Sequence, residues 1–364
     1  MPEALIIDAC RTPRGIGKVG KGALADFHPQ HLAATVLKAL AERNQLDTAE
    51  VDDVIWGTST QRGRQAMDMG RMALLDAGFD RRASGVTLDR FCGSGITTVN
   101  LAAASVAAGF EDLVIAGGTE MMSYTATLAD PSNPSMMDAG NLRLRARHPQ
   151  SHQGVCADAV ATLEGISREA LDDLALVSQQ RAAAAIAGGH FARSVVPVRR
   201  DDGSVALDHE EFPRPQTTRE GLGQLKPAFT ALAEHPLDDQ GTTYGGLIRQ
   251  VYPALKIRHV HHAGNSSGVV DGAGAVLLAS GAYVKKRGLK PRARVVAMAN
   301  MGDCPTLMLN APVPAARKVL AKAGLTVADI DLWEINEAFA VVAEKFIRDL
   351  WLDRDKVNVN GGAM

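Results

Sequence analysis

The sequence predicts a layered α/β protein. Short apolar runs typical of strands alternate with helix-like runs through the first 118 residues, and the same order returns near the end of the sequence. The stretch between these regions is rich in Pro, Arg and His and lacks the alternation. With 364 residues, of which 46% are hydrophobic, the chain can bury a large core, which suggests several domains or one duplicated unit.

The first region contains its expected elements at short intervals. The expected strands are Leu5–Asp8, Val51–Trp56, 86–88 and Leu113–Ala116, and the expected helices are Gln30–Arg43, Met67–Ala77 and 94–108. The last helix is small or apolar on nearly every face and is followed by Gly109, a helix stop signal. We therefore expect it to lie in a core.

A second copy of this pattern is expected late in the sequence. Residues 38–56 align with 317–335, so that Leu46 matches Leu325, and residues 4–9 align with 293–298. Three elements in the same order indicate an internal duplication. In this second half 357–359 corresponds to 86–88, and the sequence reaches Met364 before a counterpart of the 94–108 helix. We therefore expect the second half to be incomplete at Met364.

The domain boundaries follow from the repeat. We expect 1–119 with 257–284 to form an N-terminal domain, 120–256 to form an inserted loop domain, and 285–364 to form a C-terminal domain. The insertion has one clear predicted helix, from Ser167 to about Ala187. Long insertions of this kind often carry substrate contacts, although a simple lid or an oligomerisation arm is the other interpretation.

Composition narrows the class of protein. A net charge of −2 argues against nucleic acid or a membrane surface as the main partner. The four cysteines form no CxxC pair, which is typical of a reducing compartment. Asp8 interrupts the first apolar run, so no signal peptide or membrane span is expected there. These features predict a cytoplasmic protein.

Cys92 is the candidate nucleophile. It lies in Phe-Cys-Gly-Ser-Gly, between the expected 86–88 strand and the expected 94–108 helix. A cysteine at a helix start faces unpaired N–H groups and the positive end of the helix dipole, and both favour the thiolate. A buried packing cysteine is the alternative. The glycines on both sides of Ser94 argue against it, because they let backbone approach a ligand closely.

Several ordered blocks resemble the thiolases, the acetyl-CoA acyltransferase family. They are Cys92-Gly-Ser-Gly, Gly117-Gly-Thr-Glu-Met-Met122, His262-Ala-Gly-Asn-Ser-Ser-Gly268 and Asn336-Glu-Ala-Phe-Ala340. The resemblance implies a five-layer αβαβα fold made of two duplicated halves with an inserted loop domain. It also implies either thiolytic cleavage of a 3-ketoacyl-CoA or the reverse Claisen condensation. Coenzyme A is then a substrate or product, and no other cofactor and no metal is expected.

The resemblance assigns roles to residues of these blocks. It implies that Cys92 carries the acyl group, with its own backbone N–H as half of an oxyanion hole, and that Asn336 positions a water beside the thioester oxygen. The CoA-binding residues that it implies are His152, Arg214, Phe229, Ala263, Ser267, Gly268 and Phe339. Arg219 or simple solvated charge are alternatives for Arg214, and Phe229 could equally be a core residue.

The sequence departs from the family pattern in three ways. The family's Gly-His-Pro histidine and Cys-x-Gly cysteine have no counterpart in these residues. The segment between Phe229 and Gly264 is long, which suggests a degradative branch or a bulky substrate. His261 and His262 stand where smaller residues are common, and no carboxylate or cysteine at ligand spacing makes them a metal site.

Three hypotheses follow. The first is an active acyltransferase, which would form a homodimer or homotetramer. The second is a thiolase-like acyl-CoA-binding protein that is catalytically impaired because the C-terminal His and Cys are missing. The third, a condensing enzyme of the ketoacyl-synthase or hydroxymethylglutaryl type, is disfavoured by the Gly-Gly-Thr-Glu-Met-Met and Asn-Glu-Ala-Phe blocks. Acyl chain length, reaction direction and the choice between dimer and tetramer stay open.

Overall fold

The computed structural model describes residues 3–129 and 137–364, which form two compact units. Unit 1 consists of Met1–Leu128, Phe191–Phe212 and Val269–Val296, and unit 2 consists of Ala129–His190, Pro213–Gly268 and Ala297–Met364. The three-domain division expected from the sequence repeat stays a prediction. Each unit is built around its own core of buried side chains.

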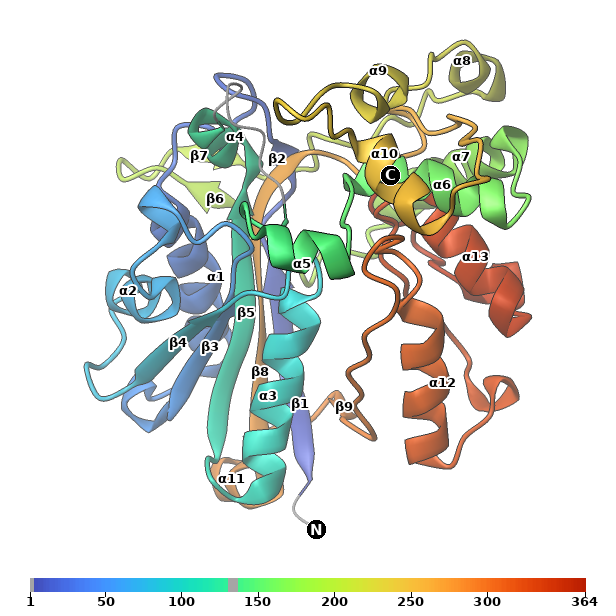
Figure 1. Ribbon diagram of the computed structural model, residues 1–364. Helices are drawn as coiled ribbons and strands as arrows, with labels where there is room; N and C mark the ends of the chain where they lie inside the picture. The colour runs from blue at the N-terminus through green and yellow to red at the C-terminus, as the bar shows by residue number, and fades with distance from the viewer. Residues whose placement is uncertain (1–2, 130–136) are drawn as a thin grey trace. The chain divides into compact units, whose positions relative to one another are not determined.

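A mixed sheet organises unit 1 (Figure 1). Its strands are β1 (Ala4–Arg11), β2 (Gly15–Ile16), β3 (Asp53–Gly57), β4 (Ser84–Leu88), β5 (Leu113–Met121), β8 (Val270–Ser280) and β9 (Ala293–Arg294). They follow the order β4-β3-β5-β8-β1-β9, and β2 pairs with β8. The strands β4, β3 and β5 are parallel, whereas β8 is antiparallel to both β5 and β1. The carboxyl ends of β4, β3 and β5 therefore meet at one edge of the sheet.

Helices cover both faces of this sheet. Figure 1 shows α1 (Pro29–Asn44) and α2 (Met69–Asp76) on one side and α3 (Ser94–Ala108) on the other. Glycines let these helices pack closely on β3. A Cβ on Gly70 of α2 would lie 2.9 Å from Trp56 Cβ, and a Cβ on Gly57 of β3 would lie 2.8 Å from Ser94 of α3. Successive strand residues point to opposite faces, so Trp56 faces α2 and Gly57 faces α3.

The remaining elements of unit 1 are short. They are α4 (Met122–Thr125), α11 (Gly281–Arg287) and a two-stranded sheet of β6 (Val198–Arg199) and β7 (Val205–Leu207). All strands and helices expected in the first 118 residues are confirmed, with β1 and β5 longer than expected. The β5 strand continues beyond Ala116 because Gly117 and Gly118 let Trp56 and the β3 backbone approach it closely.

Unit 2 is mainly helical. Its helices are α5 (Leu142–Arg147), α6 (Gln153–Leu163), α7 (Arg168–Ala187), α8 (Arg219–Gly223), α9 (Thr230–Ala233), α10 (Tyr244–Val251), α12 (Pro312–Ala323) and α13 (Ala340–Leu350). The expected helix from Ser167 is confirmed as α7, but the expectation of one clear helix in 120–256 is wrong. The sequence of α6 is small and apolar around its whole circumference, so it shows no helical period.

The two aligned stretches, 38–56 and 317–335, share local structure, and the duplication itself stays a prediction. The first copy ends α1 with Gln45 at φ 49° and then forms a 3₁₀ turn at Thr48–Glu50. The second copy ends α12 with Gly324 at φ 68° and then forms a 3₁₀ turn at Val327–Asp329. The matched leucines repeat the same bond, from Leu46 N to Ala41 O at 2.9 Å and from Leu325 N to Leu320 O at 3.0 Å.

Of the strands expected in the second copy, 293–298 forms only the two-residue strand β9, and the pairing of 330–335 with 357–359 is reduced to a bridge. Trp333 pairs with Val357 through an isolated parallel bridge, and 357–359 does not form a strand. The backbone of Asn358 has φ 46°, which lies outside the extended region. Its side chain takes the place of backbone hydrogen bonds between strands, because it accepts from Ile335 N at 2.9 Å and donates to Ile335 O at 2.9 Å. The extended pairing therefore stops after one step.

Candidate active site

Cys92 lies on a tightly braced turn between β4 and α3. Phe91 just before it has φ 49°, a left-handed conformation that is costly for a bulky residue. The side chain of Ser94 stabilises this turn, because its hydroxyl oxygen accepts from Arg90 N at 2.8 Å and its O–H donates to Phe91 O at 2.7 Å. Phe91 N also donates to Asp89 Oδ1 at 2.7 Å. The turn holds Cys92 on the surface of unit 1 as an exposed residue.

Glu120 lies at the same edge of the sheet as Cys92. Gly57 of β3 lies between Leu88 of β4 and Gly118 of β5 in the sheet register. Cys92 follows Leu88 by four residues and Glu120 follows Gly118 by two, so both come just after the same level of the sheet. The Glu120 carboxylate accepts hydrogen bonds from the loop after β3: from Ser59 N (2.8 Å), Ser59 Oγ (2.9 Å), Thr58 Oγ1 (3.2 Å) and Gln65 Nε2 (2.8 Å). A negative charge is therefore fixed close to the nucleophile.

The electrostatics of Cys92 correct the sequence expectation. Desolvation raises the pKa of the thiol above its ordinary value of 9.0, its own backbone N–H lowers it, and the charges of Glu120 and Asp89 raise it again. The net shift is upward, because desolvation together with the charges of Glu120 and Asp89 outweighs the bond from the backbone N–H. Cys92 is therefore a thiol at rest, and a base would have to take its proton for it to act as a nucleophile.

In unit 2, three of the expected CoA-binding residues share a continuous row of aromatic rings. His152 contacts Phe229 with 5.8 Å between ring centroids, and Phe229 contacts Phe339 at 5.8 Å. Tyr244 extends the row beyond His152 at 5.5 Å, and His261 extends it beyond Phe339 at 5.6 Å. The chain thus brings together rings from separate segments of sequence.

The contacts of His152 indicate which of its ring nitrogens carries the hydrogen. It is the N-cap of α6, and its Nδ1 accepts from Gly154 N at 3.1 Å. Desolvation lowers the pKa of its imidazole, so the ring is neutral with its hydrogen on Nε2. Gly154 leaves space for Phe229, because a Cβ there would lie 2.3 Å from the ring. The start of α6 therefore presents a neutral donor beside an aromatic wall.

Two buried aspartates hold the irregular segment 258–268, which carries Ala263, Ser267 and Gly268. Asp158 of α6 accepts from His261 Nδ1 at 2.8 Å and from the backbone N–H of Val260 and His261. Asp172 of α7 accepts from His262 Nε2 at 2.9 Å and from Asn265 Nδ2 at 2.8 Å. The histidines that the sequence left unexplained are thus anchors of this segment.

The protonation of both aspartates fits that role. Burial alone would raise the pKa of Asp158, but the hydrogen bonds from His259 and His261 outweigh it and lower the pKa. Burial likewise opposes ionisation of Asp172, and the bonds from His262, Asn265 and Arg168 lower its pKa. Buried carboxylates that are fully bonded in this way stay ionised and fix the groups around them.

Asn336 is exposed, and its neighbours are fixed. Glu337 is buried and accepts from Ser178 Oγ at 2.7 Å, Asn358 Nδ2 at 2.8 Å and Met364 N at 3.3 Å. The 258–268 segment pairs with the stretch after Asn336, where Ser267 N donates to Ala338 O at 3.0 Å. Gly268 N donates to Ala363 O at 2.8 Å. Asn336 thus projects from a rigid support.

The structure distinguishes the two candidate arginines. Arg219 forms an ion pair with Asp173. Arg214 is exposed, and only its backbone is engaged, with N donating to Gln179 Oε1 at 2.8 Å. Within the described ranges its guanidinium makes no hydrogen bond or ion pair, which favours Arg214 as the cation available to a phosphate.

The expected site residues thus fall into two groups. Cys92 lies in unit 1, and the other expected residues lie in unit 2: His152, Arg214, Phe229, Ala263, Ser267, Gly268, Asn336 and Phe339. Sequence reasoning missed Tyr244, Asp158 and Glu337. A signal existed for Asp158, because a carboxylate inside the small apolar helix α6 needs a buried partner.

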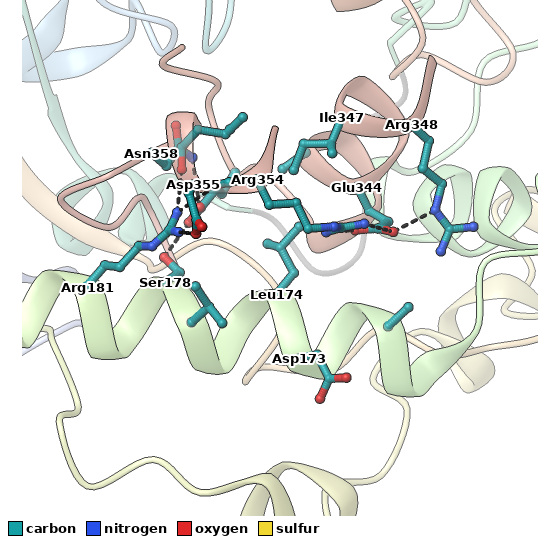
Figure 2. Close-up of a pocket in the computed structure, with 15 residues that line it drawn as sticks. Asp173, Leu174, Ser178, Arg181, Glu344, Ile347, Arg348, Arg354, Asp355 and Asn358 are labelled. Carbon is teal, nitrogen blue, oxygen red and sulfur yellow. Dashed lines mark hydrogen bonds and ion pairs between the residues drawn. The ribbon is translucent and has the colours of Figure 1, made fainter. Parts of the chain in front are cut away.

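A cavity of about 450 Å³ in unit 2 does not include these expected residues. It is lined mainly by α7, α13 and the turn at 354–358. Figure 2 shows Arg348 and Arg354 converging on Glu344, with bonds of 2.6 to 2.7 Å, and Arg181 reaching Asp355 at 3.0 Å. Glu344 and Asp355 are therefore paired with arginines of the same cavity, whereas Asp173 pairs with Arg219, which is not one of the lining residues.

Two further features bear on metals and membranes. Among residues 3–129 and 137–364 no cluster of His, Cys, Asp and Glu could hold a metal ion. The stretch Phe91–Ala108 is long and apolar enough to cross a membrane by length and composition alone. In the structure most of this stretch is α3, which packs on the β3 and β5 strands of the sheet.

Comparison with known proteins shows which family this chain resembles. Residues 4–234 match the family description "Thiolase, N-terminal domain", and residues 289–364 match "Thiolase, C-terminal domain". The "Beta-ketoadipyl-CoA thiolase" of Escherichia coli is 41% identical over 383 residues, covering 100% of this chain and 88% of that protein. The "Acetyl-CoA acetyltransferase" of Escherichia coli strain K12 is 39% identical over 376 residues, with coverage of 100% and 88%.

A solved structure supports the same conclusion. The crystal structure of the Bacillus anthracis acetyl-CoA acetyltransferase has a TM-score of 0.80 and 32% sequence identity, covering 100% of this chain and 87% of that chain. The thiolase-like α/β fold is therefore confirmed. These relatives are named as enzymes, which supports the acyltransferase hypothesis and not the binding-only alternative. The chain belongs to the thiolase family of acyltransferases.

Proposed function

We propose that Cys92 of this thiolase accepts the acyl group of a 3-oxoacyl-CoA and passes it to the thiol of coenzyme A. The observation that carries the proposal is the placement of Cys92. It is an exposed cysteine on a braced strand–turn–helix junction, at the edge where three parallel strands end. Nucleophiles held on such turns are accessible and oriented for attack.

The proposed reaction has two stages. The Cys92 thiolate attacks the C3 carbonyl carbon, the C2–C3 bond breaks, and its electron pair leaves on C2 of an acetyl-CoA enolate that then takes up a proton. The thiol of coenzyme A next gives up its proton and attacks the acyl-Cys92 thioester. The bond between Cys92 sulfur and the acyl carbon breaks, and the released Cys92 thiolate takes up a proton to regenerate the thiol. The exposed Asn336 is the group we assign to orient a water beside the thioester oxygen, which stabilises the enolate.

The CoA-binding part of the proposal lies in unit 2. We assign Phe229 and Phe339 to an apolar wall, and His152 to a neutral donor beside it. We assign Ala263, Ser267 and Gly268 to the approach of the pantetheine arm and Arg214 to a nucleotide phosphate. Support comes from the aspartate-anchored 258–268 segment and from the exposed guanidinium of Arg214.

Substrate and assembly are proposed at the level of class. The relatives are named for β-ketoadipyl-CoA and for acetyl-CoA, so both 3-oxoadipyl-CoA and acetoacetyl-CoA belong in the substrate panel. We propose a homodimer or homotetramer that is cytoplasmic and needs no cofactor beyond coenzyme A. The open edge strand β4, on which Val86 is 45% exposed, fits a subunit contact. Sedimentation of the purified protein tests the assembly.

Substitution of the nucleophile tests the function. Cys92→Ser is expected to abolish thiolysis of both substrates, and Cys304→Ser, which removes a partly buried thiol of unit 2, is expected to leave it unchanged. Saturating acyl-CoA should protect Cys92 from iodoacetamide, as read by peptide mass. Wild-type turnover by Cys92→Ser would contradict the assignment.

A further inference from the structure

His261 is a buried histidine that uses one of its two ring nitrogens. The side chain is fully buried, and Nδ1 lies 2.8 Å from Asp158 Oδ1. Nε2 has no hydrogen-bond partner among the residues that the structure describes. Because a carboxylate only accepts, Nδ1 carries the hydrogen and donates it to Asp158. The ring is therefore held by one bond and by its packing.

Asp158 also holds the backbone of this segment directly. Asp158 Oδ1 also accepts from Val260 N at 3.0 Å and His261 N at 2.9 Å, and Oδ2 accepts from His259 Nδ1 at 2.7 Å. The backbone carbonyl of His261 accepts from Ala228 N at 2.9 Å. These bonds do not involve the His261 ring. The Nδ1 bond then sets which way the ring faces.

The ring of His261 meets Phe339 nearly at a right angle. The centroids are 5.6 Å apart and the planes are inclined at 82°, and on the same ring Phe229 packs at 5.8 Å and 76°. Phe339 is 5% exposed and is the N-cap of α13, but no side-chain hydrogen bond caps this helix there. Its backbone is held by an isolated antiparallel bridge with Ser266, and packing by its ring neighbours orients its side chain.

We propose that His261 is a positioning residue, which orients Phe339 by its ring and thereby fixes the Asn336 segment. This proposal rests on the proposed function, in which Asn336 takes part in the chemical step. The aspartate supplies the bond that fixes the imidazole, the imidazole packs nearly at a right angle to the Phe339 ring, and the backbone pairing of Ser267 with Ala338 links the two segments. His261 acts through Phe339 and touches no substrate.

Two substitutions separate the bond from the ring. His261→Asn keeps an N–H donor near the place of Nδ1 and removes the ring. His261→Phe keeps a ring and removes the donor. His259→Asn is the matched control, because His259 bonds the other oxygen of Asp158 and lies outside the row of rings. Thermal unfolding of each variant shows whether the protein still folds.

Steady-state thiolysis gives the first readout. We expect His261→Asn to lower kcat by about 10- to 100-fold while KM for coenzyme A changes by less than about twofold, since a small misplacement of a catalytic segment reduces the chemical step most. His261→Phe should lower kcat less, and His259→Asn should retain wild-type values. Wild-type kcat in His261→Asn, or a fall in kcat matched by His259→Asn, would overturn the proposal.

Fluorine NMR of protein labelled with 4-fluorophenylalanine gives a readout independent of activity. The Phe339 signal is assigned as the one that disappears in Phe339→Leu. It should shift in His261→Asn and His261→Phe and keep its position in His259→Asn. An unshifted signal in both His261 variants would overturn the proposal. Absence of thiolysis in the wild type would instead contradict the proposed function, and the fluorine signal would still decide whether His261 orients Phe339.

Discussion

The carboxylate of Glu120 raises the pKa of Cys92 from the same edge of the sheet. Its position is fixed by the bonds from Thr58, Ser59 and Gln65, so the charge cannot turn away from the thiol. The protein thus keeps its proposed nucleophile protonated at rest. This arrangement limits modification of the exposed thiol and makes attack depend on a base.

The first prediction concerns the pH dependence of Cys92 alkylation. Only the thiolate reacts, so the iodoacetamide rate should rise with pH toward a midpoint above the ordinary 9.0. Glu120→Gln removes a negative charge, so it should lower that midpoint and speed alkylation at pH 7. Glu111→Gln, the same change before the start of β5, is the control and should leave the profile unchanged. An unaltered midpoint in Glu120→Gln would show that the carboxylate does not act on Cys92.

A second prediction concerns Gly154. Its replacement by Ala would put Cβ 2.3 Å from the Phe229 ring, so the ring must move away from the start of α6. Overpacking of this kind should cost about 1–3 kcal/mol of unfolding free energy and raise KM for coenzyme A. Gly223→Ala, where the new Cβ meets nothing within 4 Å, is the control. Urea unfolding and steady-state kinetics measure both effects, and equal behaviour of the two variants would contradict the packing account.

A third prediction concerns the carboxylate beside Asn336. The Glu337 carboxylate accepts hydrogen bonds from Ser178, Asn358 and Met364. A glutamine has an NH₂ group in place of one carboxylate oxygen, and this donor would face another donor. Glu337→Gln should therefore lower the unfolding free energy by about 1–3 kcal/mol. The exposed Asp331 offers the control, and Asp331→Asn should stay within about 0.5 kcal/mol of wild type. Denaturant titration would reject this role if both variants unfolded at the same midpoint.

A fourth prediction concerns acid stability. The folded pKa of Asp158 lies below its ordinary value of 3.8, because the bonds from His259 and His261 outweigh burial. The stabilisation is therefore complete well above pH 3.8 and is lost as the pH falls through 3.8 toward the folded pKa. Asp158→Asn should flatten the acid branch of the plot of unfolding free energy against pH. A plot parallel to that of wild type would contradict this linkage.

The helices and strands of the first 118 residues could be predicted because their apolar runs and stop signals are local, whereas the central strand β8 (Val270–Ser280) was not predicted. Strands such as β3 are short apolar runs closed by turn residues, and α3 ends at Gly109 as expected. Periodicity fails for α6, whose residues are small and apolar on every side. It also fails at Asn358, where a side chain takes over the backbone bonds of a strand.

The candidate site was predictable where a motif carries the chemistry. Cys92 and Asn336 stand in such blocks, whereas the anchoring roles of His261 and His262 depend on Asp158 and Asp172, which are distant from them in sequence. The pKa of Cys92 was predicted with the wrong sign, because a helix start was considered without the desolvation of the thiol and without the charges of Glu120 and Asp89. Such couplings depend on pairs of residues that only the fold brings together.

A fifth prediction concerns metal removal. The proposed reaction uses thiol, amide and backbone groups, and no metal-binding cluster is found in the part of the chain that the structure describes. Dialysis against EDTA should therefore leave thiolysis unchanged, and added zinc or magnesium should not raise it. Loss of activity on chelation, with recovery on adding metal, would contradict this expectation.

The acyl-enzyme provides the most direct test of the central claim. The protein is incubated with acetoacetyl-CoA or 3-oxoadipyl-CoA without free coenzyme A, quenched in acid and digested, and the mass of each cysteine peptide is measured. An acyl group is expected on the peptide with Cys92 and on none with Cys10, Cys156 or Cys304, and added coenzyme A should remove it. An acyl group on another cysteine of the wild-type protein would contradict the account. Thiolysis by a Cys92→Ser protein that forms no acyl adduct would contradict it as well.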